Sequence, residues 1–135
     1  MNARYVRTLL GFLLVSLVVD VCTATADEPR KQLSEAEKID ALIRSVENEK
    51  GSVFIRNDEE HTPKAAADHL RSKRRYAGRK ITTARQFIDK LATGSSQTGK
   101  AYRIRLADGK EMTSAEFLNG KLAKLLASER APSPH

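Results

Sequence analysis

Cysteine is nearly absent from this chain of 135 residues, and long apolar runs are absent altogether. The one cysteine, Cys22, has no second thiol to pair with, so an intramolecular disulfide is excluded. The longest largely apolar run, residues 8–19, falls short of the roughly 20 residues that a membrane-spanning helix needs. A folded domain in this chain must therefore be held together by its hydrophobic core.

The first residues have the three parts of a secretory signal peptide. Arg4 and Arg7 form a basic start, the apolar run follows, and Ala24-Thr25-Ala26 is a small-x-small cleavage site. We therefore predict a signal peptide at 1–26, cleaved near Ala26, and a periplasmic or secreted mature protein. A lipoprotein signal needs a small residue directly before the modified cysteine. Because Asp20-Val21 precedes Cys22, the sequence argues against a lipid anchor there.

Acidic residues are too few to balance the basic ones. The chain has 24 Lys and Arg against 17 Asp and Glu, a formal net charge of +7 at pH 7. Such an excess favours anionic partners, which in a cell envelope are phospholipid, lipopolysaccharide or acidic glycans; another periplasmic protein stays open as a partner. Export argues against nucleic acid and nucleotides. A basic surface that only keeps the protein soluble is the alternative interpretation.

The patterns after residue 33 predict two similar units, each with a helix, a hairpin and a second helix. Capping boxes and apolar stripes spaced by three and four residues indicate the helices, and short β-branched runs beside tight turns indicate the strands. The first unit has a helix from Ser34 to Gly51, strands at 52–56 and 59–61 around Asn57-Asp58, and a helix over 64–76 that ends at Gly78. We expect Ala66 and Leu70 on the inner face of that second helix.

The second unit repeats this order. It has a helix from a Thr83/Gln86 capping box to Gly94, strands at 101–106 and 110–112 around Asp108-Gly109, and a last helix from a Thr113/Glu116 box. We therefore predict an α+β fold in which about four helices pack with two small β-hairpins. The predicted boundaries are a polar lead-in at 27–32, a single domain at 33–128 and a disordered tail at 129–135.

The stretch from Gly94 to Lys100, GSSQTGK, has the glycine and lysine spacing of a phosphate-binding loop. That motif needs a hydroxyl after the lysine, where this chain has Ala101. It also needs a strand before the glycines and a helix after them, whereas the predicted order here is reversed. We therefore predict a helix stop and a turn into a strand, with no nucleotide site and no cofactor.

Candidate side chains for chemistry are present, but no spacing brings them together. Ser95 or Ser96 could act as a nucleophile with His69 as its base, because serine needs a neighbouring base to attack at neutral pH. The position of His69 on its helix favours a half-buried packing role instead, and no strand-to-helix elbow surrounds either serine. A small hydrolase is therefore the second hypothesis. The acidic stretch 58–61 predicts a solvated loop and no metal site, since consecutive turn residues point in different directions.

The basic run 71–80 has the highest charge density of the chain, with six basic residues and no acid. On a helix, Arg71, Arg74 and Arg75 would share a face, and Arg79 and Lys80 would extend it. Guanidinium and ammonium groups in such a cluster suit phosphates or carboxylates, so we predict a contact surface here. A solvated face without a partner is the alternative.

Four short motifs occur in a fixed order: Phe54-Ile-Arg-Asn57, Ala65 to Arg71, Phe87-Ile88 and Ser95 to Tyr102. In this order they resemble an uncharacterised family of exported bacterial proteins, domain of unknown function 5329, over about residues 36–126. The resemblance implies a small exported domain of Gram-negative bacteria and brings no known reaction, ligand or partner. The shared residues that it implies as a site or a structural network are Arg56, Asn57, His69, Ser95, Ser96, Gly99 and Tyr102.

The chain departs from this family pattern at several positions. Asp58 and Thr98 stand where the pattern has glycine and serine, and Ser52 and Leu106 stand where some members carry cysteines. No bridge is therefore implied. The leading hypothesis is an exported, non-catalytic binding module for an anionic envelope component, in which Arg56, Asn57 and Tyr102 join the basic run as binding residues.

Overall fold

Each of the four α-helices begins at a hydroxyl side chain that accepts a hydrogen bond from the backbone N–H three residues on. These caps are Ser34, Thr62, Thr83 and Thr113, and Ser34, Thr83 and Thr113 are the ones that the sequence analysis names. The structure, a computed structural model, describes residues 32–131. Its elements are α1 (Glu35–Glu47), β1 (Val53–Arg56), β2 (Glu59–His61), α2 (Pro63–Ala77), the 3₁₀ turn η1 (Gly78–Lys80), α3 (Ala84–Phe87), the π-helical turn η2 (Ile88–Ala92), β3 (Arg103–Arg105), β4 (Glu111–Thr113) and α4 (Ser114–Arg130).

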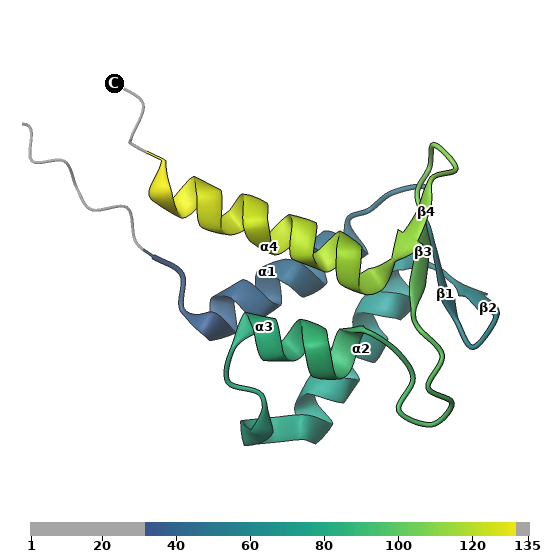
Figure 1. Cartoon of the computed structure of the whole chain (residues 1–135), viewed down its shortest axis with the longest axis horizontal. Helices are drawn as coiled ribbons and strands as arrows, with labels where there is room; N and C mark the ends of the chain where they lie inside the picture. The colour runs from purple at the N-terminus through teal and green to yellow at the C-terminus, as the bar shows by residue number, and fades with distance from the viewer. Residues whose placement is uncertain (1–31, 132–135) are drawn as a thin grey trace, which may run out of the picture.

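The two predicted hairpins are joined into one antiparallel sheet with the strand order β2-β1-β3-β4 (Figure 1). Asn57 and Asp58 form the β1–β2 turn with φ angles of 52° and 67°. The join is the pairing of β1 with β3, in which Phe54 lies opposite Ile104. Because an isolated hairpin is marginally stable, the join lets both hairpins share one buried face. The predicted single α+β domain with four helices is confirmed.

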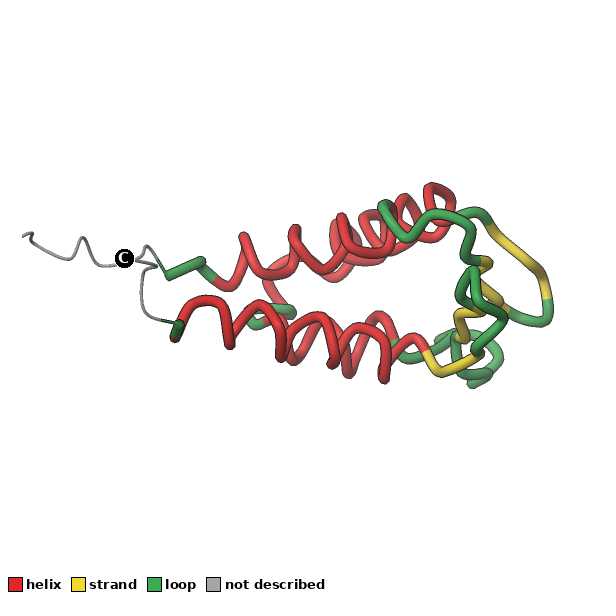
Figure 2. Tube along the Cα trace, turned by 90° about the horizontal axis from the view of Figure 1, so that it is seen from above, coloured by secondary structure: helices red, strands yellow, loops and turns green. Residues whose placement is uncertain are grey.

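The sheet covers one end of two layers of helices (Figure 2). The largest fully buried side chains come from α1, from the α3–η2 segment, from the sheet and from α4; they are Leu42, Ile43, Val46, Phe87, Ile88, Ile104 and Leu118. The ring of Phe54 on β1 packs edge to face against the ring of Phe117 on α4, with the ring centres 6.3 Å apart. This contact connects the sheet to the helices.

Three local details differ from the sequence predictions. On α2 the fully buried alanine is Ala67, whereas Ala66 is only partly buried. The Gln86 side chain accepts from the Thr82 backbone and hydroxyl, so the second capping box is only half formed. The third helix widens into η2 and ends at Ala92, before Gly94. The wider π-helical turn shifts the buried positions, so that Ala92 is fully buried and Leu91 only partly buried.

Both ends of the described chain lie at the end of the helices away from the sheet (Figure 1). There the Leu33 N–H donates to Glu129 Oε1 at 2.8 Å, and α4 continues to Arg130, past the domain boundary predicted at residue 128. The predicted signal peptide and most of the lead-in and tail lie outside the described residues. Among residues 32–131, no helix has the length and apolar character to span a membrane.

Candidate functional site

His69 and Lys73 lie four residues apart on α2, and both contact the buried phenol of Tyr102. The His69 Nε2 atom lies 3.2 Å from the Tyr102 hydroxyl oxygen. The Lys73 ammonium lies 3.3 Å from the same oxygen, donates to the Gly94 carbonyl at 3.0 Å, and lies 4.9 Å from the centre of the Tyr102 ring. Residues four apart share one helix face, so α2 presents both side chains to the segment that leads into β3.

Burial and positive charge shift the pKa values of all three groups. Burial lowers the pKa of the His69 imidazole, and the charges of Arg56, Lys73 and His61 lower it further. Burial also lowers the pKa of the Lys73 ammonium, with a smaller contribution from Arg56. Burial raises the pKa of Tyr102, against an opposing effect of Arg56. The surroundings therefore favour the neutral imidazole of His69 and disfavour the charged form of the Lys73 amine.

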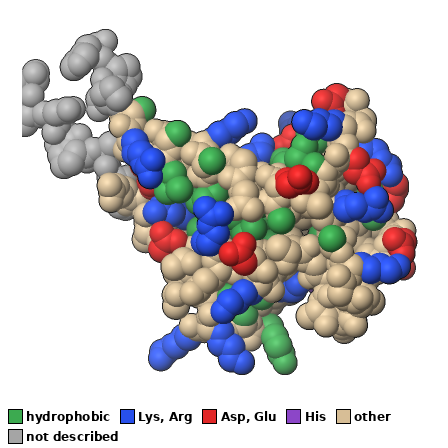
Figure 3. Space-filling model, in the orientation of Figure 1, with side chains coloured by type: hydrophobic (Ala, Val, Ile, Leu, Met, Phe, Trp, Pro, Cys, Tyr) green, Lys and Arg blue, Asp and Glu red, His purple; other side chains and the backbone are tan. Residues whose placement is uncertain are grey.

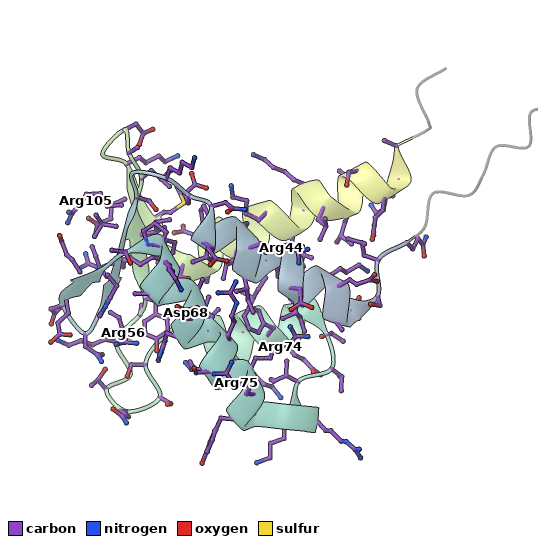
Figure 4. All side chains as sticks on the ribbon, turned by 180° about the vertical axis from the view of Figure 1, so that it is seen from behind. Arg44, Arg56, Asp68, Arg74, Arg75 and Arg105 are labelled. Carbon is purple, nitrogen blue, oxygen red and sulfur yellow. The ribbon has the colours of Figure 1, made fainter. Side chains whose placement is uncertain are left out.

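These groups line a cleft of about 320 Å³ between α2, the β1–β2 turn and the 94–101 segment. Its lining residues are Arg56, Asn57, His69, Lys73, Ser95, Ser96, Gln97 and Tyr102. Figure 4 shows Arg56 between the β1–β2 hairpin and α2, apart from Arg74 and Arg75 farther along the helix. The cleft contains two cations and no carboxylate, and the Arg56 guanidinium makes no hydrogen bond or ion pair within residues 32–131.

The unused polar groups of the cleft are mainly hydrogen-bond donors. Lys73 uses two of its three N–H donors on the protein, and Arg56 uses none of its five within the described chain. Asn57 accepts from the Thr98 hydroxyl at 2.6 Å through Oδ1, which leaves its NH₂ group to donate. A cleft rich in donors and positive charge is suited to an acceptor-rich, anionic group.

The segment from Gly94 to Ala101 is a tightly bonded turn. The buried Ser95 hydroxyl accepts from the backbone N–H groups of Gln97 and Thr98, and Gly99 has a φ of 70°. A β-carbon at Gly94 would lie 2.7 Å from the Lys100 carbonyl oxygen, so this position requires glycine for close approach and not as a helix stop. Five N–H groups of this loop, those of Ser95, Gln97, Thr98, Gly99 and Lys100, donate inside the turn and are not directed to a ligand.

No hydrogen bond joins His69 to Ser95 or Ser96 in the described part of the chain. His69 instead directs Nε2 to Tyr102, and Ser95 serves the turn. Ser96 is exposed and lines the cleft with its hydroxyl unbonded. The geometry thus lacks the contact between nucleophile and base that a serine hydrolase uses.

Two acids of the stretch after β1, Asp58 and Glu60, are engaged in ion pairs. Asp58 pairs with Lys100, Glu59 lies 3.9 Å from His61, and Glu60 pairs with Arg105 at 2.8 Å. Within residues 32–131, no group of three acidic, histidine or cysteine side chains is placed to hold a metal ion.

Four arginines of the basic run 71–80 line one groove of about 740 Å³, and two of them are already paired with acids; the four are Arg71, Arg74, Arg75 and Arg79. Arg71 pairs with Glu47 of α1 and with Asp68, and Arg74 pairs with Asp40 of α1. Arg75, Arg79 and Lys80 are exposed, and Lys and Arg side chains project around the end of α2 and η1 in Figure 3. The predicted contact surface is thus divided into arginines that hold α2 against α1 and cations that stay free of such pairs.

Sequence reasoning missed Lys73 and Gln97 as cleft residues. Lys73 was treated only as part of the basic run, although its position four residues after His69 places it on the same helix face. Gln97 lies at the turn tip, and no sequence signal pointed to it. Of the residues shared in the family resemblance, the fold brings Arg56, Asn57, His69, Ser95, Ser96 and Tyr102 together around the cleft.

The fold and the cleft define a small α+β protein with a cationic site where its sheet meets a helix. Residues 33–126 match the model of the Family of unknown function (DUF5329), and the chain belongs to this family. The chain is also 41% identical over 68 residues to the "Uncharacterized protein YfeK" of Salmonella typhimurium strain LT2. That match covers 50% of this chain and 57% of the relative, so the chain spans little more than half of that protein's length. No solved structure matches the chain significantly.

Proposed function

We propose that the protein is an exported, non-catalytic binding module that holds an anionic group of a cell-envelope component in the Arg56–Lys73 cleft. One observation carries this proposal: two cations line the same cleft, and neither has a carboxylate partner in the described structure. Burial already lowers the pKa of the Lys73 ammonium. An anion from outside would supply the missing counter-charge, and its desolvation would be offset by charge-assisted hydrogen bonds.

The arrangement also favours binding over catalysis. The lowered pKa of His69 gives a neutral imidazole, yet its Nε2 atom is already directed to Tyr102. Ser95 serves as a backbone acceptor in its turn. Both groups therefore stabilise the wall of the cleft, and Arg56, Lys73, Asn57 and Ser96 remain to contact a ligand.

Export and the class of envelope partner belong to the same proposal. The signal-peptide pattern at 1–26 supports export, and the net charge of +7 supports an anionic partner such as phospholipid, lipopolysaccharide or an acidic glycan. Residues 32 and 131, the two ends of the described chain, lie at the end of the helices away from the sheet.

Binding to three defined probes tests this function: phosphatidylglycerol vesicles, lipopolysaccharide and polygalacturonate, each at low and high ionic strength. We expect salt-sensitive binding to at least one probe. Arg56→Gln should weaken that binding by about tenfold or more, because it removes a charge-assisted hydrogen bond. Arg103→Gln is the matched control, since Arg103 lies on the neighbouring strand and is paired with Glu111. Equal effects of the two substitutions would contradict the assignment of the cleft.

A further inference from the structure

A second, smaller cavity of about 30 Å³ adjoins the cleft. Arg56, His69 and Tyr102 line both spaces, so a ligand held by Arg56 lies at the junction between them. Phe54 and Leu70 give the smaller cavity an apolar wall. A ligand in the cleft can therefore extend one substituent into this cavity.

The volume limits that substituent to a very small group. A cavity needs roughly 10–15 Å³ of this kind of volume to hold one water-sized group, so about 30 Å³ has room for one or two such groups. A hydroxyl or a methyl group fits, whereas a ring or a branched chain does not.

The polarity of the cavity distinguishes between those two groups. His61 lines it, and its Nε2 atom is buried without a hydrogen-bond partner, the one such side-chain atom found within residues 32–131. The nearest carboxylate oxygen, on Glu59, lies 3.9 Å away, beyond hydrogen-bond distance. A buried polar atom without a partner is costly, so a hydroxyl would gain a hydrogen bond that a methyl group cannot form.

Resting on the proposed anion-binding function, we propose that the ligand class is a 2-hydroxycarboxylate, a carboxylate whose neighbouring carbon bears a hydroxyl. Arg56 and Lys73 hold the carboxylate at the cleft, and the hydroxyl enters the small cavity and bonds His61 Nε2. His61 is thereby a specificity-determining residue. Short hydroxy acids such as glycolate and lactate, and open-chain aldonic acids, share this chemistry.

Glycolate and propionate provide a direct test, because they differ only in a hydroxyl against a methyl group of similar size. Both are titrated into the purified protein at pH 7.5, with acetate and inorganic phosphate alongside, and the backbone amide signals of Arg56 and Tyr102 are followed by NMR. We expect glycolate to bind roughly fivefold more tightly than propionate, the factor that corresponds to one net neutral hydrogen bond. Propionate binding as tightly as glycolate, or acetate as tightly as both, would overturn the inference.

The variant His61→Leu removes the nitrogen and keeps a side chain of similar bulk. We expect it to abolish the preference for glycolate and to change acetate affinity less than twofold. Glu60→Gln, one residue earlier on the same strand and exposed, should keep the preference. If no anion shifts the two amide signals, the proposed function of the cleft fails. If all four anions bind alike, the cleft stands and the hydroxycarboxylate assignment alone is refuted.

Discussion

Positive charge lies on both sides of α2 and is used in opposite ways. On the face toward α1, Arg71 and Arg74 are matched by Glu47, Asp68 and Asp40. Toward the sheet, Lys73 and the neighbouring Arg56 have no carboxylate partner in the described structure. The paired face holds two helices together, and the open face forms a cleft.

This difference shows that charge density along a sequence does not equal charge available to a partner. Arginine is well suited to pair with carboxylates, and two arginines of the basic run form ion pairs with acids on α1. These arginines are therefore not available to an outside partner. Exposed pairs of this kind contribute little stability, and salt screens them. Arg56 of the cleft was less conspicuous in the sequence because it is a lone arginine on a strand.

Disrupting the turn from Gly94 to Ala101, which forms one side of the cleft, should have the largest effect on stability. Gly94→Ala would place its β-carbon 2.7 Å from the Lys100 carbonyl oxygen, a backbone atom that cannot move aside cheaply. We expect a loss of about 1–3 kcal/mol in the free energy of unfolding, measured by urea denaturation.

The same substitution at Gly120 provides the control. Gly120 lies within α4, and a β-carbon there meets no atom within 4 Å. Gly120→Ala should therefore raise the free energy of unfolding by about 0.5–1 kcal/mol. Losses of equal size at both positions would show that close approach is not the reason for glycine at position 94.

Neutralising one cation on each face compares the faces directly. Lys73→Met should weaken binding of the anionic probe by roughly tenfold, since it removes the ammonium and its donor from the cleft. Arg74→Met removes the same formal charge from the paired face and should change affinity less than about twofold. Equal losses, measured by isothermal titration at one ionic strength, would mean that only net charge matters.

The two faces should also respond to acid in separate windows of pH. The native pKa of His69 is lowered from 6.5, so its neutral form stabilises the fold above that value. This contribution is lost as pH falls from 6.5 toward the native pKa, because the unfolded chain binds the proton first. Hydrogen bonds to Arg71 and Lys64 lower the pKa values of Glu47 and Asp68 from 4.5 and 3.8, so the paired face loses stability only below that range.

Urea denaturation between pH 7.5 and pH 3 measures these windows. His69→Gln should flatten the decline in stability just below pH 6.5 and leave the decline below pH 4.5 in place. An unchanged profile in the variant would show that the imidazole does not titrate differently in the folded and unfolded chains.

Removing one arginine from the paired face should have the smallest effect. Arg71→Gln breaks the pairs with Glu47 and Asp68, both of which are partly exposed. We expect a decrease in melting temperature smaller than that of Gly94→Ala, with no change in affinity for the anionic probe. A tenfold loss of affinity in this variant would place the ligand on the paired face instead.

The helices and turns were predictable because local chemistry determines them. A hydroxyl N-cap marks each of the four helices, and Asn57-Asp58 adopts the positive φ angles of a tight hairpin turn. The join between β1 and β3 was not predicted. It pairs residues that are distant in sequence, such as Val53 and Arg105, and no local pattern encodes such a pairing.

The cleft was predicted in part. The family resemblance named Arg56, Asn57, His69 and Tyr102, and the fold brings them together. Lys73 was assigned to the basic run because sequence distance shows neither which face of a helix meets an acid nor which meets a cleft. The structural role expected for Ser95 is present in its two backbone hydrogen bonds.

The outer strands of the sheet also determine how the protein meets other chains. β2 and β4 are the two edges, and each is three residues long. Exposed carboxylates lie on both, Glu59 and Glu60 on one and Glu111 on the other. Short, charged edges oppose the addition of a further strand, so the sheet is protected at both ends against aggregation by β-pairing.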